Sequence, residues 1–436
     1  MPKVFVCGTS WGDSSGKPSY FNKIFKDKNV AILESNNQGI ESFSQLELGD
    51  LVAAKKGKKI IAIGKVNSEV EQSATWHDYA NEDEAKEFGF NLDSEIHAVS
   101  IKDWYVLNEN NYIEANIRQG GCFAGRENKK SIVNAYKRGL EKMQKEEIIN
   151  ILKNKKQIIL QGAPGTGKTY STSDIAVKLI DENAPSDRAE LMKRYKELVN
   201  KEQIFFTTFH QSMDYEEFVE GIKPKTENGS ITYKLDDGIF KKACKSAESN
   251  QQNKIVLIID EINRGNISKI FGELITLLET DKRKGKENEI EAILPYSKEK
   301  FSVPDNLYII GTMNTADRSI GYVDYALRRR FAFITIKADI SAIEKYYNDN
   351  KNSDCKDNAI NLFNEIKNLI EENINEEFEA DDIMIGHSYF MAQNLEELQN
   401  KLDYEIKPIL LEYLKDGILK LNKDKNIKET IKKLEL

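Results

Sequence analysis

The chain has 436 residues, which is enough for two or three domains that each bury a core. Hydrophobic residues make up 40% and charged residues 31% of it, as is typical of soluble globular proteins, and the net charge of −8 argues against a protein that coats nucleic acid. No apolar run approaches the ~20 residues that cross a bilayer, and the first residues lack a signal-peptide pattern. Four cysteines without paired spacing favour reduced thiols and no zinc site. We therefore expect a cytoplasmic protein without a membrane partner.

Residues 1–126 predict a small β-rich domain, because short apolar runs alternate with polar turns. The runs lie at 3–7, 51–54, 60–66, 96–99 and 104–107. Between the second and third runs lies a basic turn, whose lysines are the best local candidates for contact with nucleic-acid phosphates. A turn that is merely solvated is about equally consistent with the pattern. The four lysines are Lys55, Lys56, Lys58 and Lys59.

All three tryptophans of the chain fall in this first domain. Tryptophan in a small β domain is usually core, and we expect that of Trp104, which lies in a predicted strand. Trp11 and Trp76 have polar neighbours, which favours partial exposure and a pocket that stacks an extruded base. Residues 49–66 resemble the small barrels of the PUA and EVE-like families, which implies a domain that reads modified bases in DNA or RNA. Residues 127–147 have apolar positions at helical spacing and predict a linker helix packed on the next domain.

Residues 148–337 predict a parallel α/β domain built around a phosphate-binding loop. A glycine-rich loop lies between an apolar strand at 158–160 and a helix that begins near Tyr170, which is the context that such a loop requires. Its backbone amides would surround the phosphates, Lys168 would reach the β- and γ-phosphates, and the Thr169 hydroxyl would hold Mg²⁺. A chance glycine-rich turn is the alternative. The residues expected to bind nucleotide are Gly162, Ala163, Pro164, Gly165, Thr166, Gly167, Lys168, Thr169 and Tyr170.

Two later strands of this domain end in polar residues suited to hydrolysis. The apolar run 255–259 delivers Asp260, a candidate Mg²⁺ ligand, and then Glu261, which is placed to polarise the attacking water. The alternative is an acidic start of a loop. Strand 307–311 is followed by Asn314, at the sensor position of AAA+ ATPases, where a polar side chain can reach the γ-phosphate or its water.

Several arginines lie near the C-terminal end of the predicted α/β domain. Arg318 would face the same site, and three arginines at 328–330 cannot all pair within one subunit. In a ring, Arg329 and Arg330 could reach the nucleotide of a neighbour, an effect worth ~10³–10⁵ in rate where such fingers have been measured. A solvated helix end is the alternative. Residues 338–436 predict a helical lid without any arginine, so His387 or a lysine would have to replace the arginine that AAA+ lids often supply.

Several segments between residues 158 and 413 resemble the McrB family, the motor subunits of modification-dependent restriction systems. They are Thr-Phe-His-Gln-Ser at 208–212, Tyr-Glu-Glu-Phe-Val-Glu-Gly at 215–221, Asp-Glu-Ile-Asn-Arg-Gly-Asn at 260–266, Leu-Pro-Tyr-Ser at 294–297, Gly-Thr-Met-Asn-Thr-Ala-Asp-Arg-Ser at 311–319 and Gly-His-Ser-Tyr-Phe at 386–390. The resemblance implies a hexameric GTPase ring that binds modified, methylated DNA and drives a separate McrC-like nuclease.

The expectation that the chain hydrolyses GTP rather than ATP comes from the resemblance to the McrB family and not from individual residues. Asn314 and Asp317 also match the Asn-x-x-Asp pattern with which GTPases grip guanine, but the place of Asn314 after a strand favours the sensor position. The competing hypothesis for the whole chain is an AAA+ ATPase that remodels a protein, with the first domain as an adaptor.

Overall fold

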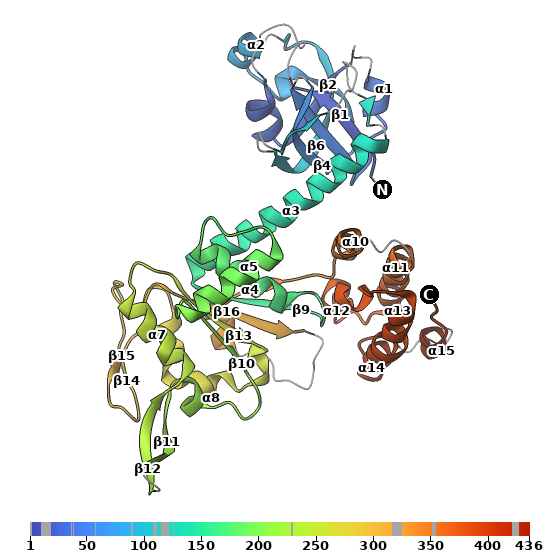
Figure 1. Cartoon of the computed structure of the whole chain (residues 1–436). Helices are drawn as coiled ribbons and strands as arrows, with labels where there is room; N and C mark the ends of the chain where they lie inside the picture. The colour runs from blue at the N-terminus through green and yellow to red at the C-terminus, as the bar shows by residue number, and fades with distance from the viewer. Residues whose placement is uncertain are drawn as a thin grey trace. The chain divides into compact units, whose positions relative to one another are not determined.

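The computed structural model describes residues 2–9, 19–35, 37, 39–56, 58–88, 90–107, 111–114, 122–124, 126–227, 230–315, 325–350, 355–420 and 427–436. The chain divides into two compact units, Met1–Gln144 and Lys145–Leu436 (Figure 1). Each unit has its own hydrophobic core, so each is described by itself.

The first unit is a mostly antiparallel sheet with short helices around it (Figure 1). Its strands pair in the order β2-β6-β4-β3-β1-β8, with β5 on β6 and β7 on β4; β1 and β3 are parallel. The strands are β1 Val4–Gly8, β2 Val30–Glu34, β3 Leu51–Lys56, β4 Lys59–Val66, β5 Glu71–Thr75, β6 Glu95–Val106, β7 Ile113–Glu114 and β8 Cys122–Phe123. The helical segments are η1 Phe21–Lys26, α1 Ile40–Phe43, η2 Trp76–Asp78 and α2 Glu82–Phe88. The predicted β-rich domain is confirmed.

Two predicted strands turn out to be one. Residues 96–99 and 104–106 lie along the single long strand β6, and Leu107 follows its end. The strand carries a left-handed residue, Asp103, with φ of 58°. The polar residues between the two apolar runs are solvent-facing positions of that strand, so their polarity did not mark a break. Trp104 lies in the core, as predicted, and stacks on Phe25 with ring centroids 5.9 Å apart.

The expected partial exposure of Trp76 is wrong. Its side chain is only 2% exposed, and its ring stacks on Phe90 with centroids 4.2 Å apart. The indole Nε1–H donates a hydrogen bond to Glu34 Oε1 at 3.2 Å. Polar sequence neighbours did not expose the ring because they cap a 3₁₀ turn whose other face is the core. Trp11 lies outside the described residues.

The predicted linker helix is longer than expected. Helix α3 runs from Arg126 to Lys155 without a break. Its residues Ile132, Val133 and Tyr136 are buried in a cluster with Val4 and other strand residues of the first unit. Only the last turns of the helix join the core of the second unit, through Ile148, Ile149 and Leu152.

The second unit begins with a five-stranded parallel sheet in the order β10-β13-β16-β9-β17. The strands are β9 Gln157–Gly162, β10 Ile204–Thr208, β13 Ile255–Asp260, β16 Leu307–Asn314 and β17 Ala332–Thr335. Two separate clusters bury the faces of this sheet. Helices α4 Lys168–Ile180 and α5 Arg188–Asn200 contribute to one, while α7 Ile239–Ser249, α8 Ile267–Phe271 and the 3₁₀ segment η5 Gly272–Leu278 contribute to the other.

A buried glutamine ties the base of β9 to the rest of the sheet. The Gln157 amide Nε2 donates to Leu278 O and to Arg330 O, at 2.9 Å and 2.7 Å. Its Oε1 accepts from the fully buried guanidinium of Arg283 at 2.8 Å. Arg283 also donates to the carbonyl oxygens of Leu278, Pro304 and Leu307, so four protein acceptors surround this charge. Burial lowers the pKa of Arg283 to about 10.

Two hairpins extend from the α/β domain: β11 Glu220–Glu227 with β12 Ser230–Asp237, and β14 Ala292–Ile293 with β15 Lys300–Phe301. The buried ammonium of Lys241, on α7, lies 2.6 Å from Glu220, 3.0 Å from Asp237 and 3.0 Å from Glu299. The same Glu220 accepts the backbone amides of Tyr296 and Ser297. One buried lysine therefore joins both hairpins to the helix.

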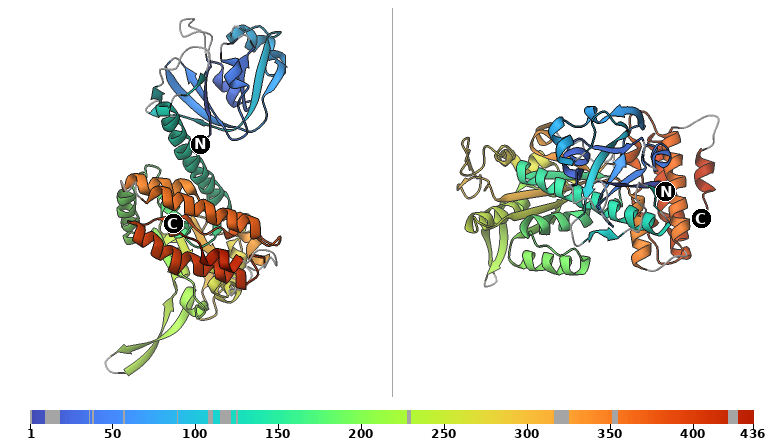
Figure 2. Two further views of the ribbon diagram at one scale, coloured as in Figure 1. Left: turned by 90° about the vertical axis from the view of Figure 1, so that its right-hand side faces the viewer. Right: turned by 90° about the horizontal axis from the view of Figure 1, so that it is seen from above.

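The predicted helical lid is confirmed, and its own core holds it together. Its helices are α10 Ile340–Asp349, α11 Lys356–Asn373, α12 Ala380–Ile383, α13 Leu395–Lys401, α14 Lys407–Lys415 and α15 Ile427–Lys432, with the short segments η6 His387–Phe390 and η7 Leu402–Ile406 (Figures 1 and 2). Within the part of the chain that the structure describes, none of the helices is long and apolar enough to span a membrane.

Replacing Lys241 tests how strongly the hairpins depend on it. We expect Lys241→Met to destabilise the second unit by about 3–5 kcal/mol, because it leaves Glu220 buried without its charge partner. Urea denaturation followed by circular dichroism measures the loss. Lys242→Met is the matched control, since Lys242 is exposed on the same helix and should change stability by no more than about 0.5 kcal/mol. Equal stability of the two variants would contradict the assigned role of Lys241.

Candidate functional site

The glycine-rich loop connects β9 to α4 as predicted. Gly165 and Gly167 have φ of 78° and 79°, a left-handed conformation that residues with a Cβ rarely adopt. A Cβ on Gly165 would also lie 2.6 Å from the ring of Tyr389 in the lid. The left-handed backbone at both positions and the nearby Tyr389 ring at Gly165 therefore favour glycine. With this backbone, the amides of the loop and of the first turn of α4 can surround a phosphate.

Lys168 is the first residue of α4, and its side chain bonds to the start of the loop. Its ammonium donates to Gly162 O at 2.9 Å and to Ala163 O at 2.8 Å, and the residue is only 7% exposed. Burial lowers its pKa to about 8, while the nearby carboxylates of Glu261 and Asp260 act in the opposite direction. A buried cation bonded to neutral carbonyls fits a loop that receives an anionic phosphate.

Asp260 and Thr169 meet where a magnesium ion would be held. The Thr169 hydroxyl donates to Asp260 Oδ1 at 3.1 Å, and the Thr312 hydroxyl donates to the same oxygen at 2.5 Å. Carboxylate and hydroxyl oxygens are the hard donors that Mg²⁺ prefers. Asp260 ends β13, and Thr169 lies in the first turn of α4, so the sheet places the two groups side by side.

Glu261 contacts Asn314 directly. The Asn314 amide donates to Glu261 Oε1 from the end of the neighbouring strand β16, and the Arg264 Nε donates to Glu261 Oε2 at 3.1 Å. The Glu261 backbone is left-handed, with φ of 52°, and its amide donates to the Thr312 hydroxyl at 3.0 Å. The carboxylate is therefore held through both oxygens and through its own backbone.

Sequence reasoning missed Thr312 and Arg264. Thr312 bonds both to Asp260 and to the backbone of Glu261, so it joins the two acidic residues. A strand period of two puts Thr312 on the same face as Asn314, and that spacing could have identified it. Arg264 follows Glu261 by three residues, which is the spacing of one helical turn.

Arg329 and Arg330, at the end of α9 Tyr325–Arg330, differ in exposure and in how closely they pair with an acidic residue. Arg330 pairs with Glu279 at 2.8 Å, and both side chains are nearly buried, so this arginine is held within its own subunit. The Arg329 side chain is 76% exposed and lies 3.7 Å from the same carboxylate. The expectation that both arginines extend toward a neighbour therefore fits Arg329 only. Asp317 and Arg318 lie outside the described residues.

The lid lies directly against the phosphate-binding loop. Backbone amides of Gly386 and Ser388 donate to Pro164 O and Gly165 O, at 3.0 Å and 3.1 Å. A Cβ on Gly386 would lie 1.9 Å from the Gly165 carbonyl carbon, so only glycine permits this approach. Thr315, just after β16, donates to Asp382 O of the lid at 2.9 Å.

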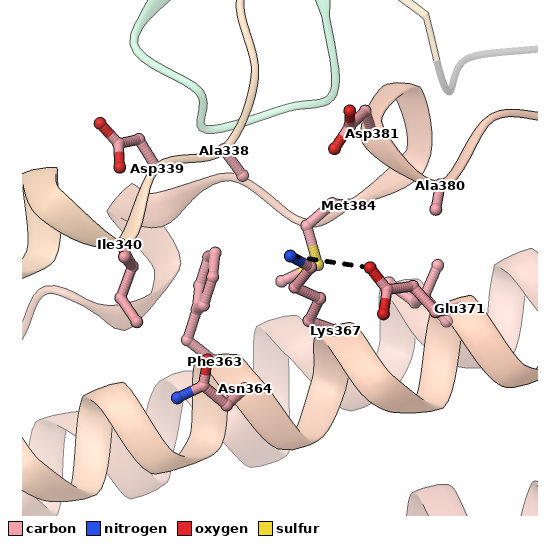
Figure 3. A pocket seen from close by; sticks show the side chains of 11 residues that line it. Ala338, Asp339, Ile340, Phe363, Asn364, Lys367, Glu371, Ala380, Asp381 and Met384 are labelled. Carbon is pink, nitrogen blue, oxygen red and sulfur yellow. Dashed lines mark ion pairs between the residues drawn. The ribbon is translucent and has the colours of Figure 1, made fainter. Parts of the chain in front are cut away.

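A separate cavity of about 240 Å³ lies inside the lid. Figure 3 shows the ring of Phe363 and the side chains of Ile340 and Met384 in it, beside the ion pair of Lys367 with Glu371. None of its lining residues belongs to the phosphate-binding loop or to the acidic strand β13. The cavity is therefore distinct from the predicted nucleotide site.

The candidate nucleic-acid contacts of the first unit are unevenly placed. Lys56, Lys58 and Lys59 are exposed at the turn between β3 and β4, but Lys55 is only 6% exposed. The Lys59 ammonium lies 5.7 Å from the centre of the Tyr112 ring. In the second unit, Tyr170 follows the phosphate-binding loop. Its side chain is 54% exposed, and the Arg188 guanidinium lies 3.7 Å from the centre of its ring.

Comparisons with known proteins agree with this architecture. A family described as an AAA domain of the dynein-related subfamily matches residues 186–331, and the McrB alpha-helical lid domain matches residues 359–422. The AAA match begins after the phosphate-binding loop, so the loop is assigned on its own geometry.

Two curated relatives are restriction proteins. The chain is 37% identical over 290 residues to the type IV methyl-directed restriction enzyme EcoKMcrB subunit of Escherichia coli K12, covering 64% of this chain and 58% of that protein. It is 27% identical over 296 residues to the type II restriction enzyme BsuMI component YdiS of Bacillus subtilis 168, covering 61% of this chain and 79% of that protein. A solved putative ATPase from Cytophaga hutchinsonii is 14% identical with a TM-score of 0.30, covering 67% of this chain and 90% of that one.

The chain thus spans little more than half the length of its E. coli relative. The lid is nevertheless matched by a domain specific to McrB, and the α/β domain is matched as AAA, in agreement with the parallel sheet and the loop geometry. In its α/β domain the chain is therefore similar to AAA domains, and in its lid it is similar to the lid domain of McrB.

Proposed function

We propose that the chain is the motor subunit of a modification-dependent restriction system, which hydrolyses GTP with Mg²⁺ and drives a partner nuclease. The observation that carries the proposal is the contact of Asn314 with Glu261 beside the phosphate-binding loop, under a lid of the McrB type. A hydrogen-bonded carboxylate near the buried lysine of a phosphate-binding loop is an arrangement for polarising water.

Each residue has a separate task in this proposal. The loop amides and Lys168 bind the phosphates, and Thr169 with Asp260 would hold Mg²⁺, which supplies charge neutralisation at the β- and γ-phosphates. Glu261 accepts a proton from the attacking water. Asn314 fixes the Glu261 carboxylate and is close enough to share that water.

The subunits would form a hexameric ring when nucleotide binds, with Arg329 directed at the site of the neighbour. Its exposure supports this assignment, whereas the close pairing of Arg330 with Glu279 supports a structural role for Arg330. Arg318 and Asp317 remain candidates from the sequence, as residues that face the same site.

The choice of GTP is drawn from the resemblance of the sequence to the McrB family, and the choice of methylated DNA is drawn from the relatives. One relative's name describes a methyl-directed restriction enzyme and the other a restriction enzyme component. In the first unit, the exposed turn with Lys56, Lys58 and Lys59 is the proposed contact with DNA phosphates, and Trp11 is the remaining candidate for a base-stacking ring. The buried position of Trp76 favours a role in the core.

Nucleotide choice and its dependence on DNA test the proposal. We expect the purified chain to hydrolyse GTP faster than ATP, and methylated duplex DNA to be bound more tightly than the same unmethylated duplex. Phosphate release and fluorescence anisotropy measure the two effects. Exclusive use of ATP, with no response to either duplex, would instead support the alternative, an ATPase that remodels proteins.

Substitution of Glu261 separates hydrolysis from binding. We expect Glu261→Gln to lower the hydrolysis rate by about 100-fold or more, because an amide cannot accept the water proton, while nucleotide binding and ring assembly are kept. Lys168→Ala should lose both binding and hydrolysis. Steady-state phosphate release and sedimentation velocity provide the measurements, and Glu287→Gln on the exposed surface is the control. Normal turnover in Glu261→Gln would remove Glu261 from the mechanism.

Mixed rings test whether Arg329 acts on the neighbour. Arg329→Ala and Lys168→Ala subunits should each be inactive alone, yet their mixture should recover part of the activity. Recovery is expected because an intact loop in one subunit can meet an intact arginine from the next. The control mixes Arg329→Ala with the double variant Arg329→Ala/Lys168→Ala, which should recover nothing. If the first mixture is as inactive as the control, Arg329 does not act in trans.

A further inference from the structure

The two strands that carry the acidic pair and the asparagine do not end together. Strand β13 ends at Asp260, whereas its parallel neighbour β16 continues to Asn314. Glu261 therefore leaves the sheet beside a strand that runs on. Thr312, which is only 2% exposed, lies on β16 at this point, and its hydroxyl contacts both acidic residues.

The chemistry of its two partners determines what the Thr312 hydroxyl does. A hydroxyl has one proton to donate and two lone pairs that accept. A carboxylate only accepts, so Asp260 Oδ1 takes the proton, at 2.5 Å. A backbone amide only donates, so the N–H of Glu261 bonds to the hydroxyl oxygen, at 3.0 Å. One side chain thus connects the candidate Mg²⁺ ligand with the backbone of the residue that follows it.

The Glu261 backbone has a conformation that other contacts must hold. Its φ of 52° lies in the left-handed region, which residues with a Cβ rarely adopt because it is strained. The Glu261 carbonyl accepts the Arg264 amide at 2.9 Å, and the Glu261 amide donates to Thr312. The residues before it on β13 are paired with strand neighbours, so the threonine hydroxyl takes the place of a ladder bond where the chain turns away.

We propose that Thr312 is a positioning residue for hydrolysis, whose hydroxyl holds Glu261 in the left-handed conformation from which its carboxylate reaches Asn314 and the attacking water. Because the hydroxyl proton is given to Asp260, the same contact ties the position of Glu261 to the residue that would hold Mg²⁺. The inference rests on the proposed function, since it takes Glu261 as the group that accepts the water proton.

A threonine that merely fills space in the sheet is the alternative. Valine has nearly the same shape and would fill that space, but it lacks the hydroxyl and so is not equivalent in a hydrogen-bonded position. Serine keeps the hydroxyl and loses only a methyl group. Thr312→Val and Thr312→Ser therefore separate the two hydrogen bonds from the packing.

Steady-state kinetics of the full chain test the proposal, with the nucleotide that the wild-type chain hydrolyses. Thr312→Val should lower kcat about 10- to 100-fold, because the buried Glu261 amide loses its acceptor. KM should stay nearly unchanged, because the loop that binds the phosphates is untouched. Thr312→Ser should recover most of the rate. The control is Thr335→Val, since Thr335 lies on β17 of the same sheet and its hydroxyl accepts from the Gln161 side chain.

A double variant shows whether Thr312 acts through Glu261. In the Glu261→Gln background, Thr312→Val should slow the residual turnover far less than it slows the wild type, because the carboxylate that it positions is already gone. An equal further loss in that background would overturn the proposal, since the hydroxyl would then act on another group. An unchanged kcat in Thr312→Val, or a serine variant as slow as the valine variant, would overturn it as well.

The single variants show which hypothesis fails. If the wild-type chain hydrolyses no nucleotide, or if Glu261→Gln turns over normally, the proposed function fails and the role of Thr312 falls with it. If Glu261→Gln is slow while Thr312→Val is normal, only the role of Thr312 is wrong. Thermal unfolding of each variant sets an assay temperature at which all of them are folded, so a low rate does not come from a loss of fold.

Discussion

The arrangement of the site depends on the register of three parallel strands. Strand β16 lies between β9 and β13, with Asn314 opposite Gly162 and Gly311 opposite Ile259. Parallel strands in register end at the same edge of a sheet, so the loop, the acidic pair and the asparagine must meet there. A shift of one residue in β16 would turn Thr312 and Asn314 to the opposite face and disconnect Glu261 from both.

Glycine at the interface between loop and lid adds a second constraint. Gly165 and Gly386 approach so closely that a side chain on either would collide with the other segment. Backbone hydrogen bonds also join the lid to the loop. Side chains of the lid lie at the loop as well: Ser388 and Tyr389 lie beside Gly165, and His387, whose Nδ1 accepts a backbone amide, lies beside Gly167.

Local patterns in the sequence predicted the parts of the site whose partners are adjacent in the chain or in a regular sheet. The loop, Asp260, Glu261 and Asn314 each follow an apolar strand, and the sheet brings them together. The environment of Trp76 could not be predicted in the same way, because Phe90 and Glu34 bury it from distant segments. Arg330 is a similar case: its partner Glu279 lies 51 residues earlier, and nothing near the arginines in the sequence indicates that one of them is already neutralised.

The hydrogen bonds of Gln157 have a mechanical consequence for the α/β domain. The amide joins the last residue of α9 to the first residue of β9, and its oxygen is held by Arg283 in the core. The helix that carries the arginines and the strand that carries the phosphate-binding loop are therefore joined at their bases by one buried side chain. A displacement of the backbone at Arg330 would have to break this hydrogen bond or shift the start of β9 with it.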